Sequence, residues 1–345
     1  MANTENTNET EFPKKNPLSM QIDLAKFAPA TDEEKAQQEV MSESTTFFKD
    51  GMRKLLKNPL AVGSIIVLIL VIAAAVAVPM IVPYGYEEMI SVNGRRDKTA
   101  KNLGPFEWSK NEQRAIDSGE KLFPHILGTD EQCRDYFVRI LYGTRVSLFI
   151  GFFAAILVLV IGLIYGSISG YAGGKVDMVM MRIVDALYSI PDMLYLIMIT
   201  VVMGSNFLSI ILGICISSWM GMARQVRAQV MTLKEQEFSL AAFVLGASKS
   251  RILLKHLIIN SMGPIIVSFS MLVPSSIFYE ATLGFLGIGL SAPKASWGTL
   301  ANDARAMISS QPLQVVWPIL AICLTMLALN FIGDGLGDAL DPKKK

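Results

Sequence analysis

The stretch VSLFIGFFAAILVLVIGLIYGSI, residues Val146–Ile168, decides the fold class of this chain. It carries no charged residue, and it is longer than the roughly 20 apolar residues that an α-helix needs to cross the hydrocarbon core of a bilayer. Its apolar residues are continuous rather than alternating, so it does not have the pattern of a β-barrel strand. The stretch therefore predicts a transmembrane helix.

Five further stretches approach or meet the same length: Leu60–Val82, Leu187–Met203, Phe207–Ala223, Leu257–Tyr279 and Val315–Ile332. The composition agrees, because 52% of the 345 residues are hydrophobic and only 18% are charged, which is outside the range of ordinary soluble domains. The sequence predicts an all-α membrane protein with six transmembrane helices.

The positive charges orient these spans. The segment between the fourth and fifth spans carries six basic residues, which predicts a cytoplasmic loop: Arg224, Arg227, Lys234, Lys249, Arg251 and Lys255. Six spans then place both termini in the cytoplasm, and Pro83–Arg145 outside. No cleavable signal peptide is apparent, because the first apolar run is long enough to span. We expect a multi-pass protein of the plasma membrane.

The chain divides by composition into five segments. They are a flexible cytoplasmic tail (1–44), an interfacial helix (45–59), the first transmembrane helix (60–83), an external insertion (84–127) and the main membrane domain (128–340) with a loop at 236–256. The tail is polar with few aromatic residues, a composition that cannot bury a core. The interfacial helix combines apolar residues with Lys49, Arg53, Lys54 and Lys57.

The cytoplasmic loop contains the most informative motif, QEFSLAAFVLGASKSR, at Gln236–Arg251. Phe238, Ala241, Ala242 and Leu245 follow the spacing of one helix face, and Gly246 is suited to the left-handed conformation that ends a helix. The motif predicts a short helix that fits into a groove of another protein.

A repeat of small residues occurs in the second span, where Gly162, Gly166 and Gly170 recur every fourth residue. Such a repeat lets a second helix approach closely. The partner helix belongs either to this chain or to a second membrane subunit, and the sequence leaves both open.

Ionisable residues within the spans are few. Asp192 and Glu280 are candidates for a translocation path that binds a peptide amine, with structural pairing or helix capping as the alternative. His125 and His256 lie outside the spans, so no relay of acids and histidines supports a proton-coupled transporter.

Catalytic and metal-binding patterns are missing from the sequence. Gly173-Gly174-Lys175 is followed by Val176, so it is not a Walker A motif. Cys133, Cys215 and Cys323 are scattered and suggest neither a disulfide framework nor a metal site. We expect no enzymatic activity and no cofactor bound by this chain.

Several motifs together resemble the C-type permease subunit of the oligopeptide, dipeptide and nickel ATP-binding cassette importers. The matching residues are Gly128-Thr129-Asp130, Arg134-Asp135, Arg139, Tyr142-Gly143-Thr144-Arg145, Ser147-Leu148, Gly170-Tyr171, Gly173-Gly174, Asp177, Met181-Arg182, Asp185, Ile190-Pro191, Glu280-Ala281, Phe285-Leu286-Gly287-Ile288-Gly289, Ser296-Trp297-Gly298, Asn330, Gly333-Asp334-Gly335-Leu336 and Asp338-Ala339-Leu340-Asp341-Pro342. The sequence departs from the family pattern at Leu240, where glutamate is usual, and at Cys133, Ile259 and Gly337.

This resemblance implies a type I importer fold, in which the permease subunits form the path and separate ATPase subunits bind ATP. The loop would couple to cytoplasmic ATPases through Phe238, Leu240, Ala241, Ala242, Leu245, Gly246, Ala247, Ser248 and Arg251. The implied partners are a homologous second permease, two ATPases that bind ATP and Mg²⁺, an extracellular solute-binding protein and membrane lipid, with no nucleic acid. The expected solute is an oligopeptide. Dipeptide or nickel uptake is the alternative within the class, and a stand-alone secondary transporter or channel is the alternative outside it.

The external insertion matches no motif of the family. Its charges nearly balance, and Gly94, Gly104, Pro105 and Gly119 interrupt it. This pattern predicts a loop-rich lid that contacts the solute-binding protein or caps the entrance to the path, with a surface loop of no functional role as the alternative.

Overall fold

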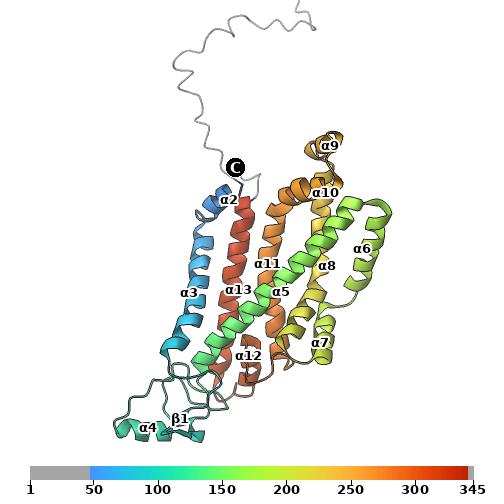
Figure 1. Cartoon of the computed structure of the whole chain (residues 1–345). Coiled ribbons are helices and arrows are strands. Elements are labelled where there is room, and N and C mark those ends of the chain that lie inside the picture. The colour runs from blue at the N-terminus through green and yellow to red at the C-terminus, as the bar shows by residue number, and fades with distance from the viewer. Residues whose placement is uncertain (1–46, 341–345) are drawn as a thin grey trace, which may run out of the picture. The chain divides into compact units, whose positions relative to one another are not determined.

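The computed structural model describes residues 47–340 (Figure 1). The predicted tail at 1–44 lies outside these residues, as does Asp341-Pro342 of the last motif. The described chain is built mainly of α-helices: α2 (Phe47–Leu55), α3 (Pro59–Ile81), α4 (Lys110–Asp117), α5 (Tyr136–Ala172), α6 (Gly174–Tyr188), α7 (Asp192–Met203), α8 (Phe207–Lys234), α9 (Glu237–Val244), α10 (Lys249–Arg251), α11 (Ile258–Phe285), α12 (Trp297–Arg305) and α13 (Pro312–Leu340).

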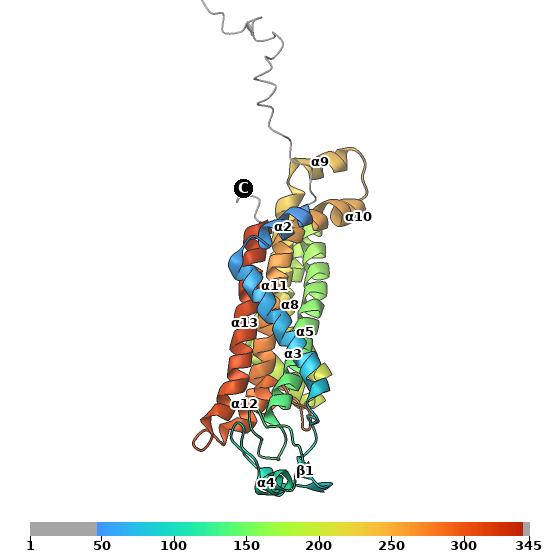
Figure 2. The same ribbon diagram turned by 90° about the vertical axis from the view of Figure 1, so that its left-hand side faces the viewer.

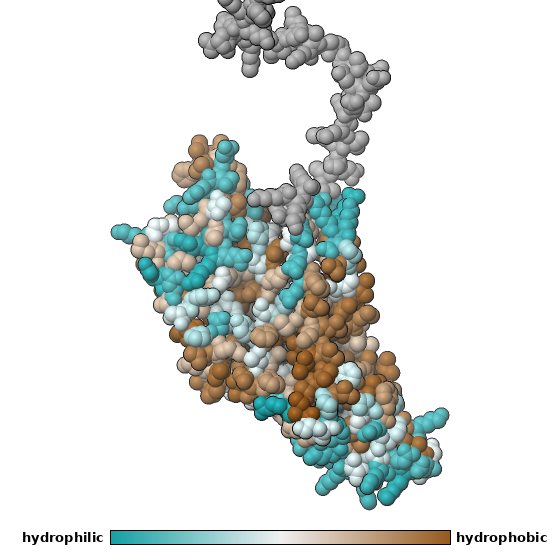
Figure 3. Space-filling model, turned by 180° about the vertical axis from the view of Figure 1, so that it is seen from behind, coloured by the Kyte–Doolittle hydropathy of each residue, from teal (hydrophilic) through white to brown (hydrophobic). Residues whose placement is uncertain are grey.

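Five of these helices are long and apolar enough to cross a membrane: α3, α5, α8, α13 and the helical run Lys249–Phe285 that contains α11. The pair α6 and α7 adds a sixth span if it is counted as one. The predicted all-α membrane fold is thus confirmed. Figure 3 shows hydrophobic residues between hydrophilic ones at the two ends of the bundle, as a bilayer requires.

The two ends of the bundle carry different structures (Figures 1 and 2). The α9 end carries α2, α9, α10 and the last turn of α13, whereas the insertion end carries α4 and a small β-hairpin. Within the bundle α5 crosses the other helices obliquely and packs along α8. Sequence segments far apart therefore meet at each end.

The third span differs from its prediction as one helix over Leu187–Met203. The chain instead forms α6 and α7, which are bent by 77° at the break Ser189–Pro191. Proline has no N–H to donate, and it disfavours helical backbone at the residue before it, here Ile190. No such residue interrupts 174–188, so the segment expected to be an inter-span loop is helical.

The glycine repeat of α5 packs against α8 of the same chain. An added Cβ would lie 2.4 Å from Met222 Cγ at Gly162, 2.3 Å from the Ala223 carbonyl oxygen at Gly166 and 2.8 Å from the Arg227 carbonyl oxygen at Gly170. The backbones of α5 and α8 approach this closely because glycine has no side chain. In this structure the groove is filled by a helix of the chain itself.

We expect Gly166→Ala to destabilise the bundle by about 1–3 kcal/mol, because the added methyl group would overlap a backbone atom that cannot rotate away. Thermal unfolding of the purified protein measures the effect. Gly221→Ala in α8 is the matched control, since a Cβ there meets nothing within 4 Å. Equal melting temperatures for the two variants would contradict this packing.

A short helix that the sequence analysis did not predict, α12, lies near the insertion end. The Ser296 side chain caps it by accepting from Thr299 N–H at 3.3 Å, and Trp297 is completely buried. Gly298 allows the close approach to α11, because an added Cβ would lie 2.2 Å from the Ala281 carbonyl oxygen. The motif Ser296-Trp297-Gly298 therefore docks a helix.

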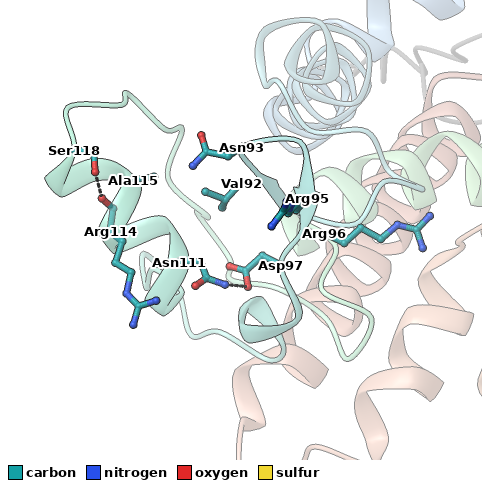
Figure 4. A pocket seen from close by; sticks show the side chains of 9 residues that line it. All are labelled: Val92, Asn93, Arg95, Arg96, Asp97, Asn111, Arg114, Ala115 and Ser118. Carbon is teal, nitrogen blue, oxygen red and sulfur yellow. Dashed lines mark hydrogen bonds between the residues drawn. The ribbon is translucent and has the colours of Figure 1, made fainter.

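The insertion is loop-rich, as predicted, but folded, and its hairpin and α4 line the pocket drawn in Figure 4. It contains a two-stranded antiparallel hairpin of β1 (Ser91–Val92) and β2 (Arg95–Arg96), a 3-10 turn η2 (Lys98–Ala100) and the helix α4. It is joined to the residue just before α13 by Gln311 Nε2, which donates to the Asn102 carbonyl oxygen, and to α5 by stacking of Tyr86 on Tyr142, whose ring centroids lie 3.5 Å apart.

Buried charges hold the insertion to the start of α5. His125 is completely buried; its Nδ1 lies 2.8 Å from Asp135 Oδ2, and its Nε2 lies 2.8 Å from Glu112 Oε1. Burial alone lowers the pKa of His125, but the hydrogen bonds to Asp135 and Glu112 outweigh it and raise this pKa to about 9. An imidazolium between two carboxylates thus links α4 to the residue that caps α5.

Candidate coupling site

The predicted coupling helix exists as α9, and a Schellman motif ends it. Gly246 N–H donates to the Phe243 carbonyl oxygen and Ala247 N–H to the Ala242 carbonyl oxygen, both at 3.0 Å. Gly246 has φ +80°, in the left-handed region that favours glycine. The geometry therefore favours glycine at this position.

The outer face of α9 is strongly apolar. Val244 (82%) and Leu245 (87%) are exposed there, beside Phe238. Leu240 and Phe243 (65%) are also exposed, but they border a groove on the side toward the bundle. Exposed apolar clusters of this kind mark a contact with another protein or a membrane. Among residues 47–340, nothing covers this face.

The inner face of α9 is turned toward the bundle. Ser239 is buried, and Ala242 packs against the core formed by α8 and the start of α11. Ala241 is exposed, whereas Ala242 is half-buried. The predicted face of Phe238, Ala241, Ala242 and Leu245 is therefore divided: three members point outward and Ala242 points partly inward.

A groove of about 500 Å³ lies between α9 and the ends of α5 and α8. Its walls include Tyr171, Leu240, Phe243 and Ile252, with the basic residues Lys234 and Lys249 beside them. Lys234 Nζ donates to the Tyr171 carbonyl oxygen at 2.6 Å, which ties the end of α8 to the end of α5.

After the turn at Gly246, the chain returns to the membrane through one helical run, Lys249–Phe285. Ser248 caps α10, as its Oγ accepts from Arg251 N–H at 3.4 Å. A π-helix, η3 (Ile252–Leu257), then leads directly into α11. The helix α9 is thus connected along the chain to α8 on one side and, through α10 and η3, to α11 on the other.

Two ion pairs join α6 to α8, and the sequence analysis missed both. Arg224 Nη2 lies 2.7 Å from Asp185 Oδ1. Arg227 makes two hydrogen bonds to Asp177: its Nε donates to Oδ1, and its Nη2 donates to Oδ2 at 2.5 Å. Ser169 of α5 donates to the same Asp177 at 2.6 Å. The sequence shows the four charged residues but not their pairing, because the partners lie about 40 to 50 positions apart and no helical or strand spacing connects them.

The two acidic residues proposed from the sequence lie in different surroundings. Asp192 begins α7 at the break of the third span, is half-buried, and accepts from the Tyr279 hydroxyl at 3.0 Å. Glu280 is completely buried and accepts from Ser147 Oγ at 2.7 Å, beside the first residue of α12. In this conformation Asp192 is accessible and Glu280 is enclosed.

Residues 161–345 match the model of the family described as binding-protein-dependent transport system inner membrane component. The chain belongs to this family. Residues 46–105 of this permease also match the N-terminal transmembrane domain of oligopeptide transport permease C. The first match covers α9 and most of the bundle, whereas the second covers α2, α3 and the first part of the insertion.

Individual relatives span nearly the whole permease. It is 41% identical to the oligopeptide transport system permease protein OppC of Bacillus subtilis (strain 168) over 92% of this chain and 96% of that protein. It is also 41% identical to the dipeptide transport system permease protein DppC of the same strain, over 87% of each chain. The glutathione transport system permease protein GsiD of Pectobacterium atrosepticum is 35% identical over 87% of this permease and 92% of its own length.

Proposed function

We propose that this permease is the subunit of an ATP-driven importer that passes oligopeptides across the membrane. The observation that carries the proposal is the exposed apolar helix α9, which the chain holds rigidly between two spans at one end of the bundle. The relatives support the solute class, since two are named for oligopeptide and dipeptide transport. Nickel uptake is not favoured by these relatives.

The proposed topology places α9, α2 and the end of α13 in the cytoplasm, and the insertion outside. Two ATPases, which bind ATP and Mg²⁺, would contact α9 and supply the energy. A second permease would complete the path, and a solute-binding protein would deliver the peptide at the insertion end. The insertion would form part of that delivery surface.

The broken third span supports a location for the path. Charged side chains at membrane depth face protein or water rather than lipid. Asp192 and the pair Asp185 and Arg224 are partly exposed near the break between α6 and α7. Non-helical backbone at this depth lies within protein or beside a water-filled cavity. We therefore assign this side of the chain to the path and the second permease, with Asp192 as the group that attracts the peptide amine.

Within the same proposal, Glu280 has a structural role: it helps to hold α11, α5 and the start of α12 together. Its carboxylate lies between α5 and the start of α12, where no peptide reaches it in this conformation. A role in the path would require α12 to move away.

A crosslinking experiment tests the orientation and the ATPase contact together. In a variant without the three native cysteines, Ala241→Cys on the outer face of α9 is expected to crosslink to an ATPase subunit in the assembled importer. Gln113→Cys on α4 is the matched control at the opposite end, exposed on a helix of equal length. Crosslinking of Gln113→Cys, and not of Ala241→Cys, to the ATPases would reverse the topology.

A further inference from the structure

The short helix α2 has three distinct faces. One face packs on the bundle: Leu55 is buried with Ala61 and Ala339, and an added Cβ at Gly51 would lie 2.6 Å from Leu340 Cδ2. This contact holds α2 across the α9 end of the bundle, as Figure 2 shows. The position of the helix is therefore set by α3 and α13 together.

The second face is apolar and exposed. Met52 (54%) and Leu56 (59%) lie one turn apart, and Leu60 (62%) follows in the first turn of α3. The span α3 begins at Pro59, directly after the turn that follows α2. The exposed apolar side chains of α2 are thus continuous with the surface that α3 presents to the hydrocarbon core, so α2 lies at the boundary of the bilayer.

The third face is basic. Lys49 and Arg53 of α2, and Lys57 in the turn that continues it, recur every fourth residue and are all exposed. Within residues 47–340 none of the three forms an ion pair, whereas Lys54, on another side of α2, lies 3.4 Å from Asp50. On a helical projection the apolar strip lies between the buried face and this basic strip.

We propose that the basic strip of α2 (Lys49, Arg53 and Lys57) binds the headgroups of anionic phospholipids in the leaflet at the α9 end of the bundle. A helix that presents apolar side chains toward the acyl chains and a neighbouring cationic strip toward the headgroups fits an anionic membrane surface. The occupant is the bilayer, because α2 is joined directly to a span and cannot leave the interface. An acidic surface of a partner protein could also bind this basic strip. The experiment below distinguishes such a protein from anionic lipid.

This site has a consequence for the end of α13. Because α2 covers Ala339 and Leu340, headgroups that order α2 also hold the last turn of α13 in place. Each basic residue near an anionic surface contributes about fivefold to the binding constant. Removal of all three charges is therefore expected to weaken headgroup binding about a hundredfold.

Amide hydrogen exchange of α2 tests the proposal on the purified full chain in nanodiscs. Phosphatidylglycerol is titrated into phosphatidylcholine nanodiscs, and exchange at 47–55 is expected to slow as its fraction rises. The variant Lys49→Gln/Arg53→Gln/Lys57→Gln is expected to show no such protection at any fraction. The matched control Lys98→Gln/Lys110→Gln/Lys121→Gln removes three exposed charges from the insertion end and is expected to behave as the wild type.

Two further measurements use the wild-type protein, so their results do not depend on whether a variant folds. High salt is expected to abolish the phosphatidylglycerol effect in the wild type, because it screens charges at a surface. Inorganic phosphate added to phosphatidylcholine nanodiscs is expected to give no protection. Protection by free phosphate would overturn the proposal in favour of a soluble anion. Protection that appears only in the assembled importer in phosphatidylcholine, and that phosphatidylglycerol does not change, would overturn it in favour of a protein partner.

Discussion

Replacing His125 with alanine is expected to destabilise the insertion by about 3–5 kcal/mol and to release it from the start of α5. The substitution removes the cation between Glu112 and Asp135 and leaves two buried carboxylates without their partner. A buried charge that loses its partner keeps its desolvation penalty. Limited proteolysis at 84–127 measures the effect, because a folded insertion protects its chain and a released one is cleaved.

The second histidine provides the matched control. His256 lies in η3 at the opposite end of the chain, so His256→Ala is expected to leave proteolysis of the insertion unchanged. A further variant, Glu112→Gln with His125→Ala, is expected to recover part of the loss because it removes one of the two unpaired charges. If His125→Ala resisted proteolysis as well as the wild type does, the buried charges would not hold the insertion.

The same cluster predicts how the stability of the insertion depends on pH. The pKa of His125 is raised from 6.5 to about 9, so its contribution is complete below pH 6.5 and is lost as the pH rises through about 9. Burial by itself raises the pKa of Glu112, but hydrogen bonds to His125 and Ser109 lower it below 4.5. The Glu112 contribution is therefore present above pH 4.5 and is lost on acidification below its folded pKa. Proteolysis across pH is expected to show the greatest protection between these limits.

Replacing Gly246 with valine is expected to abolish coupling while the bundle stays inserted and folded. Valine at φ +80° costs at least about 1–2 kcal/mol, which lowers the population of the capped turn about five- to thirty-fold. Nothing lies within 4 Å of an added Cβ, so the penalty comes from the backbone alone. Peptide uptake and peptide-stimulated ATPase activity of the assembled importer are expected to fall together.

The chain contains a close structural match for this turn. Gly119 follows α4, which like α9 has eight residues, and it takes part in a Schellman motif with Gly119 N–H donating to Ile116 and Glu120 N–H to Ala115. Its φ is +94°, and a Cβ there also meets nothing within 4 Å. Gly119→Val thus imposes a similar backbone strain at the other end of the bundle. If Gly119→Val lost ATPase coupling to the same degree, strain anywhere in the chain would explain the result, and α9 would have no special role.

Local patterns were sufficient for the spans other than the third and for the helix α9. Long uncharged runs such as Val146–Ile168 have no alternative to a helix in a bilayer, because the backbone must satisfy its own hydrogen bonds there. Gly246 indicated the end of α9 for a similarly local reason, because glycine readily adopts the left-handed backbone conformation that ends a helix. The prediction of the third span as one helix was wrong for a reason that is also local: Pro191 lies inside the apolar run and breaks the helix there.

The sequence by itself determined the helical membrane class, the number of apolar segments and the position of the short helix α9, because each depends on residues that are neighbours along the chain. Only the tertiary structure decided that the glycines of α5 pack on α8, that Ala242 points partly inward and that Glu280 is enclosed beside α12. It also decided that His125 joins Glu112 to Asp135, and that Arg227 holds Asp177. These contacts unite residues distant in the chain, and their energies come from close packing and from exclusion of water, neither of which has a period that can be read along a sequence.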